Sequence, residues 1–197
     1  MLVLLLSLPI VVSAAVVPPT TAQKILELKD LQSKLAKNPF LRYLGMSQVI
    51  SQLIVQGETV PASIDWSPFA YNTLLIPTDA ALSASGLLVQ PTTPEQALSL
   101  FKSVSYNIIK GMKPFSQLKA LAVGKTVTLL LNNGKLFRQK VNPGWGINQG
   151  TAVAFALKGK NKTEWSKILD KDIHKGSSFI AHGVNRLQTT GAAAAGA

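Results

Sequence analysis

Cysteine is absent from this chain of 197 residues. Its absence excludes a disulfide scaffold, an iron–sulfur cluster, a cysteine-based zinc site and a thiol nucleophile. Histidine is almost absent as well, because only His174 and His182 occur. His182 falls in an expected strand with no Cys or His nearby to share a metal, so we expect it to be exposed or hydrogen-bonded.

Catalytic signatures are missing too. The sequence has no GxSxG elbow, HExxH zinc motif, Walker loop or glycine-rich dinucleotide fingerprint. Asp170 and Asp172 have the D-x-D spacing of a cation site, but the flanking Lys171 and Lys175 favour a solvated loop. We therefore expect no catalytic activity, no metal and no cofactor.

Acidic residues are few and unevenly placed. Nine Asp and Glu face twenty Lys and Arg, which gives a net charge of +11 and an isoelectric point near 10.0. Residues 1–100 contain five bases and six acids, whereas residues 101–197 contain fifteen bases and three acids, with no acid between Glu95 and Glu164. With 47% apolar residues the chain is expected to fold, and its basic second half favours acidic partners.

Lysine and arginine recur at every second position in two segments of this basic half. Alternation along a strand predicts that Arg138 and Lys140 project from the same face. The stripe could bind an acidic polysaccharide or an anionic membrane surface, or it could be a solvated surface that protects strand edges. Nucleic acid is disfavoured, since aromatic residues are too scattered for a stacking platform. The candidate polyanion-binding residues are Lys135, Arg138, Lys140, Lys158, Lys160 and Lys162.

The N-terminal segment is apolar but shorter than a bilayer span, and Pro9 interrupts it. It predicts a signal peptide over residues 1–15, with an uncleaved anchor or a buried N-terminal helix as alternatives. We expect a Pro/Thr linker over 16–23, one domain over 24–188 and a small-residue tail over 189–197. The sequon at Asn161 predicts a glycosylated loop of a secreted, extracellular protein without a membrane anchor after cleavage.

Hydrophobic periodicity predicts helices first and strands later. Helices are expected over residues 25–37, 40–55, 80–84, 93–104 and 115–121, with Thr78 or Asp79 as an N-cap. Strands are expected over 73–76, 106–109, 126–131, 135–141, 145–148, 152–157 and 179–187, and Asn-Asn-Gly at 132–134 predicts a hairpin turn. This order indicates an α+β fold with a largely antiparallel sheet.

Several segments resemble the signatures of the fasciclin domain family over residues 24–188. The run TLLIPTDAAL at 73–82 resembles the first signature, a strand followed by Pro-Thr-Asp-x-Ala, with matching residues at Thr73, Pro77, Thr78, Asp79 and Ala81. Segment 106–111 resembles the family's Tyr-His strand, and segment 172–187 resembles the second signature. The further matching positions are Tyr106, Asn107, Asp172, Val184 and Asn185, where Asn107 replaces the usual histidine and Asn185 the usual aspartate.

The resemblance implies N-terminal helices packed on a mostly antiparallel β-sandwich or wedge of two sheets. It also implies a non-catalytic role in cell adhesion or in association with the extracellular matrix or cell wall, including homophilic contacts. Pro18, Pro19, Thr20 and Thr21 are a minimal version of the flank of plant fasciclin-like arabinogalactan proteins. The alternative is a carrier of small hydrophobic or acidic ligands in a pocket between helices and sheet, and a weak hydrolytic activity ranks third.

Overall fold

The computed structural model describes residues 17–87, 89–121, 123–142, 152–157 and 165–188, apart from the side chains of Tyr106 and Asn142. The expected signal peptide, the sequon at Asn161, the strand at 145–148 and the tail lie outside these residues. Among the helices that are described, none is long and apolar enough to cross a membrane.

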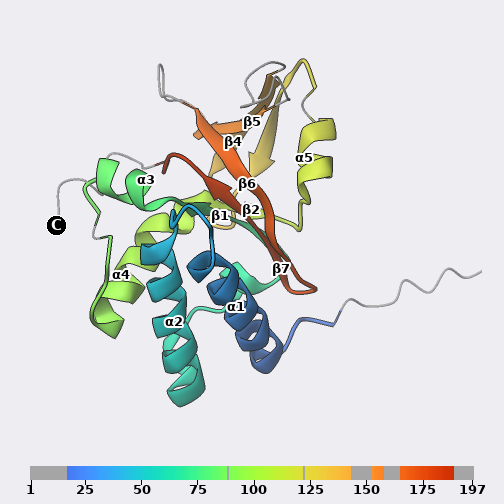
Figure 1. The fold of residues 1–197 in the computed structure, drawn as a ribbon. Coiled ribbons are helices and arrows are strands. Elements are labelled where there is room, and N and C mark those ends of the chain that lie inside the picture. The colour runs from blue at the N-terminus through green and yellow to red at the C-terminus, as the bar shows by residue number, and fades with distance from the viewer. Residues whose placement is uncertain (1–16, 88, 122, 143–151, 158–164, 189–197) are drawn as a thin grey trace, which may run out of the picture.

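Three long helices form one side of the molecule (Figure 1). Helix α1 (Thr21–Ala36) begins at a capping box in which Thr20 and Gln23 bond reciprocally, and it buries a stripe of leucines. Helix α2 (Leu44–Thr59) follows the proline turn that ends α1, as the sequence predicts. Helix α4 (Pro94–Val104) has a second capping box, between Thr93 and Gln96. The shorter helices are α3 (Asp79–Ala84), α5 (Phe115–Leu121) and the 3-10 turns η1 (Pro61–Ser63), η2 (Ser67–Phe69) and η3 (Ser105–Asn107).

Seven strands form one mixed sheet in the order β2-β1-β7-β6-β5-β4-β3. Strand β1 (Asn72–Pro77) pairs in parallel with β7 (Phe179–Val184), and the other pairs are antiparallel. The remaining strands are β2 (Ile108–Lys110), β3 (Thr126–Leu130), β4 (Leu136–Asn142), β5 (Ala152–Leu157) and β6 (Ser166–Lys175). The resemblance implied a sandwich or wedge of two sheets, and in the structure these are two halves of one sheet that β6 joins. The α+β prediction is confirmed.

Strand β6 corrects the expectation of a solvated loop around Asp170 and Asp172. The segment is a strand of ten residues that pairs with both β5 and β7. Its register against β7 shifts twice, once on each side of Asp170. The sequence of β6 lacks the alternation of apolar and polar residues that marks a strand. Irregular pairing with β7 explains this, because each register shift interrupts the period of two.

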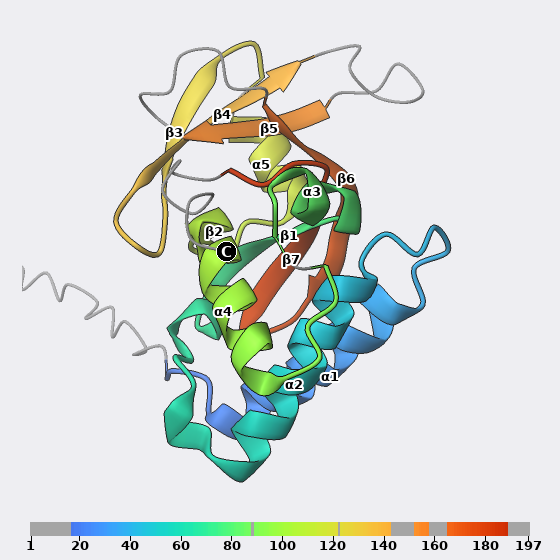
Figure 2. The same cartoon turned by 90° about the vertical axis from the view of Figure 1, so that its left-hand side faces the viewer.

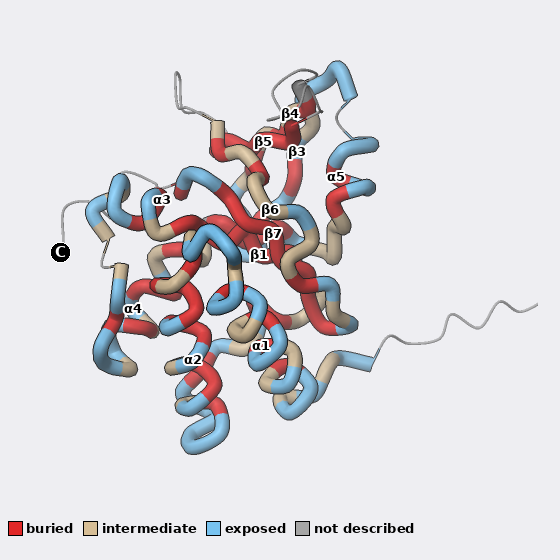
Figure 3. The backbone as a smooth tube through the Cα atoms, viewed as in Figure 1, coloured by how far each residue is buried: buried red, intermediate tan, exposed pale blue. Residues whose placement is uncertain are grey.

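The two halves of the sheet border separate hydrophobic clusters. One lies between the long helices and the β1–β7 half, and Phe69 stacks there on Phe101 with ring centroids 5.3 Å apart and meets Phe179 edge-on at 5.6 Å. The other gathers residues of α5 and of β3, β4 and β5, where Phe137 and Phe155 lie 5.9 Å apart. Figures 1 and 2 both place β3, β4 and β5 at the end of the molecule away from α1 and α2. Figure 3 shows buried residues in both halves of the sheet.

The aromatic contacts of Phe69 give a direct test of the helix-side core. Phe69→Ala should lower the free energy of unfolding by about 3–5 kcal/mol, since it removes a fully buried ring and leaves a cavity. Phe40→Ala is the matched control, because the Phe40 side chain is 66% exposed and its ring lies against the Arg42 guanidinium, 4.3 Å from the Cζ atom. Its cost should stay below about 1 kcal/mol in the same urea titration. Equal effects of the two substitutions would contradict this core.

Candidate functional site

Strand β4 separates its apolar and cationic side chains onto opposite faces. Phe137, Gln139 and Val141 are buried, and the Gln139 amide donates to the Leu118 carbonyl. Arg138 and Lys140 alternate with them and therefore point out of the other face. The prediction that these two cations share a face is confirmed by the register of β4 against β3 and β5.

Small residues of β5 form the floor between these cations and the next strand. Arg138 lies opposite Ala156, and Lys140 lies opposite Ala154. On the far side of β5, Lys167 pairs with Ala154. Because alanine projects little beyond the backbone, long side chains of β4 and β6 can reach one another across this floor.

The side chains of Arg138 and Lys140 meet at the ring of Trp165, the residue immediately before β6. The Lys140 Nζ lies 4.5 Å from the centre of the Trp165 ring, and the Arg138 Cζ lies 5.6 Å from it. Cations at these distances are attracted by the negative face of an indole. Two positive charges therefore lie at one aromatic ring. Lys167 shares the partner Ala154 with Lys140, and we define the cationic face as Arg138, Lys140, Trp165 and Lys167.

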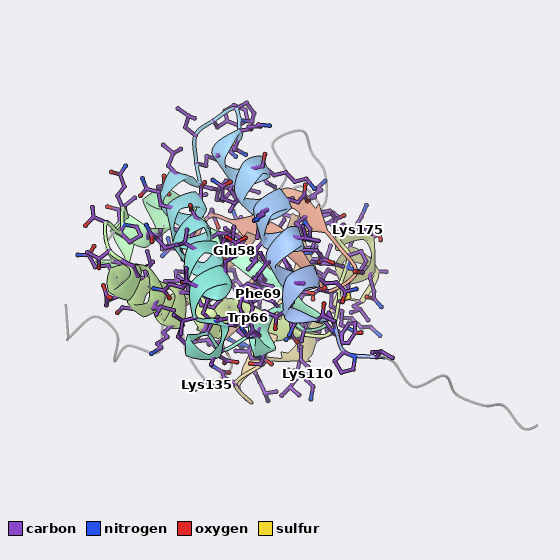
Figure 4. The ribbon with its side chains drawn as sticks, turned by 90° about the horizontal axis from the view of Figure 1, so that it is seen from below. Glu58, Trp66, Phe69, Lys110, Lys135 and Lys175 are labelled. Atoms are coloured by element: carbon purple, nitrogen blue, oxygen red, sulfur yellow. The ribbon has the colours of Figure 1, made fainter. Side chains whose placement is uncertain are left out.

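The other basic residues of the expected stripe do not belong to the cationic face or lie outside the described residues. Lys135 is exposed in the hairpin turn before β4 and is not part of the cationic face. Lys158, Lys160 and Lys162 lie outside the described residues. Figure 4 shows Lys135 and Lys175 on different sides of the molecule.

Thr73 and Thr78 of the first fasciclin-like signature form hydrogen bonds to the backbone of neighbouring segments. The fully buried Thr73 hydroxyl donates to the Gly111 carbonyl at 2.7 Å and accepts from the Lys113 amide at 2.8 Å. The Thr78 hydroxyl accepts from the Ala81 amide and so caps α3, as expected. Pro77 ends β1 beside β7.

Asp79 is the first residue of α3, but its carboxylate caps α2. Its carboxylate accepts from the Leu44 and Gly45 amides, at 3.1 and 3.0 Å, and so ties the first turn of α2 to the end of β1. Burial raises the pKa of Asp79 above its usual value, and the two amide bonds oppose that rise. The sequence suggested a cap for the helix that follows, but the contact to α2 required the tertiary fold.

Asn107 is fully buried at the end of η3, immediately before β2. Its side-chain oxygen accepts from the Gln188 amide at 3.2 Å, and its side-chain nitrogen donates to the Val104 carbonyl at 3.3 Å. Asn185 accepts from the Lys167 amide at 2.7 Å, and Val184 is buried in β7. The two asparagines therefore retain structural hydrogen bonds at the positions where they depart from the family pattern.

Asp170 and Asp172, which were expected in a loop, form hydrogen bonds with residues of other segments. Asp170 accepts from the Tyr43 hydroxyl at 2.5 Å and lies 3.7 Å from the Arg42 guanidinium. Asp172 has a positive φ of 45° and accepts from the Phe115 amide at 3.0 Å. Burial, followed by the Asp170 contact, raises the pKa of Tyr43 well above its usual value. Neither aspartate joins a group of metal-ligating side chains among the described residues.

His182 is fully buried in β7 and hydrogen-bonded through both ring nitrogens. Its Nδ1 accepts from the Asp172 amide at 3.0 Å, so its Nε2 donates to the Lys113 carbonyl at 2.9 Å. Burial lowers the pKa of His182, and the bond to Lys113 opposes that shift. Of the two alternatives expected for His182, exposed or hydrogen-bonded, the structure shows the hydrogen-bonded one.

His174, near the end of β6, contacts two acidic residues of α1. Its Nδ1 lies 2.7 Å from an Asp30 oxygen, and its Nε2 lies 3.2 Å from a Glu27 oxygen. Glu27 also accepts from the amides of Ser177 and Ser178, both at 2.9 Å. Glu27 and Asp30 lie far from this turn in the sequence, and sequence reasoning missed the contact.

Hydrogen bonding sets the direction of both carboxyl pKa shifts at this turn. Burial on its own would raise the pKa of Glu27, but the bonds from Ser177, His174 and Ser178 outweigh it and lower that pKa. The Lys34 contact lowers the pKa of Asp30, with His174 adding to the effect and burial opposing it. Because both pKa values are lower in the folded state, these contacts stabilise the fold above the unfolded values of 4.5 and 3.8.

Acidification should therefore remove this stabilisation as the pH falls from about 4.5 through the lowered pKa values. Glu27→Gln should lower the free energy of unfolding at pH 7 by about 1–2 kcal/mol, because charge-assisted hydrogen bonds are lost. The difference between the two proteins should shrink progressively below pH 4.5, because Glu27 takes up a proton first in the unfolded chain and, at lower pH, in the folded chain. A gap that stays constant down to pH 2.5 in urea titrations would contradict this role.

Comparisons with known proteins give a fold-level similarity. No family model matches the chain, and no curated protein matches it. Among solved structures, the chain is similar to a FAS1 domain pair from the insect cell adhesion molecule fasciclin I, with 14% identity and a TM-score of 0.48. The match covers 72% of this chain and 45% of that one, so the chain spans less than half the length of the protein it resembles.

Proposed function

We propose that the chain is a secreted, non-catalytic binding module of the fasciclin type whose cationic face holds acidic polysaccharide of the extracellular matrix or cell wall. The observation that supports this most strongly is the convergence of Arg138 and Lys140 on the ring of Trp165. Such binding would give the protein its place in matrix association and cell adhesion.

The local charge supports a polyanion as the ligand. No Asp or Glu occurs between Glu95 and Glu164, so strands β2 to β5 contain no acidic residue. A planar guanidinium and an ammonium ion on one face recognise carboxylates or sulfates by charge-assisted hydrogen bonds. Their field also attracts a polyanion at long range.

The spacing of the cations suits a repeating anionic chain better than a single ion. Arg138 and Lys140 are two residues apart on one strand, which separates their Cα atoms by about 7 Å. Lys167 lies two strands away from Lys140, at about 10 Å across the sheet. A polymer with charges at regular intervals can engage these positions together, and each contact releases bound counterions.

Neutralising the two cations of β4 should weaken polyanion binding in a salt-dependent way. For Arg138→Gln with Lys140→Gln, the slope of log affinity against log salt should fall in magnitude by about 1 to 2 on polygalacturonate. The matched control is Lys37→Gln with Lys175→Gln, which removes the same charge from two exposed residues on other elements. An equal loss in the control would mean that net charge, not this face, determines binding.

The role of the indole can be separated from that of charge. Trp165→Leu keeps the net charge but removes the ring that positions both cations. It should weaken polygalacturonate binding by about two- to fivefold, the equivalent of one exposed cation–π contact, and leave the salt slope nearly unchanged. Titration calorimetry at several salt concentrations measures both quantities. Unchanged affinity in a variant that melts normally would contradict the proposed geometry.

A further inference from the structure

A second candidate binding site lies at the other end of the molecule, between α2, α4 and the segment that contains η1 and η2. A pocket of about 160 Å³ opens there. Apolar side chains form most of its wall, and four polar residues stand among them. The apolar wall consists of Leu53, Ile64, Pro68, Leu98 and Phe101.

The walls of this pocket are held in place by packing from behind. Phe101 is stacked on Phe69 at 5.3 Å with a 15° angle between the rings, and it is only 7% exposed. Leu53 is fully buried on α2. A binding site with rigid walls loses little conformational entropy when a ligand enters.

Trp66 fixes the segment that closes the pocket. Its Nε1 donates to the Pro61 carbonyl at 2.9 Å, and its ring rests on Gly57, where an added Cβ would lie 2.6 Å from the indole. Figure 4 shows Trp66 next to Phe69, so the two aromatic residues brace the same segment from within. The positions of Ile64 and Pro68 in the wall follow from this anchoring.

The volume of the pocket matches a ligand with one ring. An apolar cavity of about 150 Å³ is known to accept benzene, whereas sites for drug-sized molecules measure about 300 Å³ or more. The flat ring of Phe101 and the aliphatic wall favour an apolar ring over a flexible polar chain.

The polar residues at the pocket determine the charge of the ligand. The hydroxyls of Ser63 and Ser105 donate to the carbonyls of Val60 and Lys102, at 2.8 and 2.6 Å. Lys102 is exposed and forms no ion pair with any residue that the structure describes. Its ammonium group is therefore the donor available to a ligand anion.

Asp65 restricts that anion to a single charge. One of its oxygens accepts from the Ser67 amide at 2.9 Å, which keeps the carboxylate beside the pocket. A ligand with two negative charges would meet one attractive and one repulsive group there. We propose that this pocket binds a small one-ring monocarboxylate, with the ring against Phe101 and the carboxylate at Lys102.

The full chain can be titrated with benzoate, benzyl alcohol and phthalate by calorimetry and by methyl NMR. Benzoate should bind more tightly than the other two ligands and shift the methyl signals of Leu53 and Ile64. Lys102→Gln should weaken benzoate binding by about two- to fivefold, as expected for an exposed ion pair, and leave benzyl alcohol unaffected. Lys119→Gln, which removes an exposed lysine of α5, is the matched control and should change neither affinity.

Three outcomes would overturn the proposal: no benzoate binding at millimolar concentration, the same loss in the Lys119→Gln control, or equal affinity for benzoate and benzyl alcohol in the unaltered chain. Leu98→Trp should fill the pocket and abolish binding of all three probes. If that variant does not fold, the comparison of the two lysine variants still decides the question. Polygalacturonate binding is measured separately on β4 variants, so each proposed site can fail without the other.

Discussion

The alternation of side chains along β4 is the constraint on which the proposed site depends. Phe137 and Val141 must face the inner cluster to bury their apolar surface, so Arg138 and Lys140 have only the outer face available. The alanines of β5 then leave room for both cations to reach Trp165. The same hydrophobic burial that stabilises this half of the sheet therefore also arranges its charges.

The two ends of the molecule have different physical characters. The helix-side end joins distant segments through buried polar contacts, such as those of Asp79 with α2 and of His174 with α1. Each contact satisfies a group that would be costly to leave buried and unpaired. The β3–β5 end has no acidic residue in its strands and presents cations outward. The long-range polar contacts and the outward-pointing cations of β4 therefore lie in different parts of one fold.

Local sequence patterns predicted the features that depend on neighbouring residues. The proline stop after α1, the Thr78 cap and the shared face of Arg138 and Lys140 follow from backbone geometry alone. Strand β6 was missed because its charged residues and two register shifts disrupt alternation. The contacts of Trp165, Asp79 and His174 could not be predicted, because they depend on which strands and helices become neighbours in the fold.

The most direct test of the central claim is a backbone and indole NMR titration of the chain with short oligogalacturonides at low salt. The account predicts that the Trp165 indole signal and the amides of Arg138, Lys140 and Lys167 shift together and return as salt is added. Shifts confined to other lysines, such as Lys34 and Lys37 on the helix side, would contradict it.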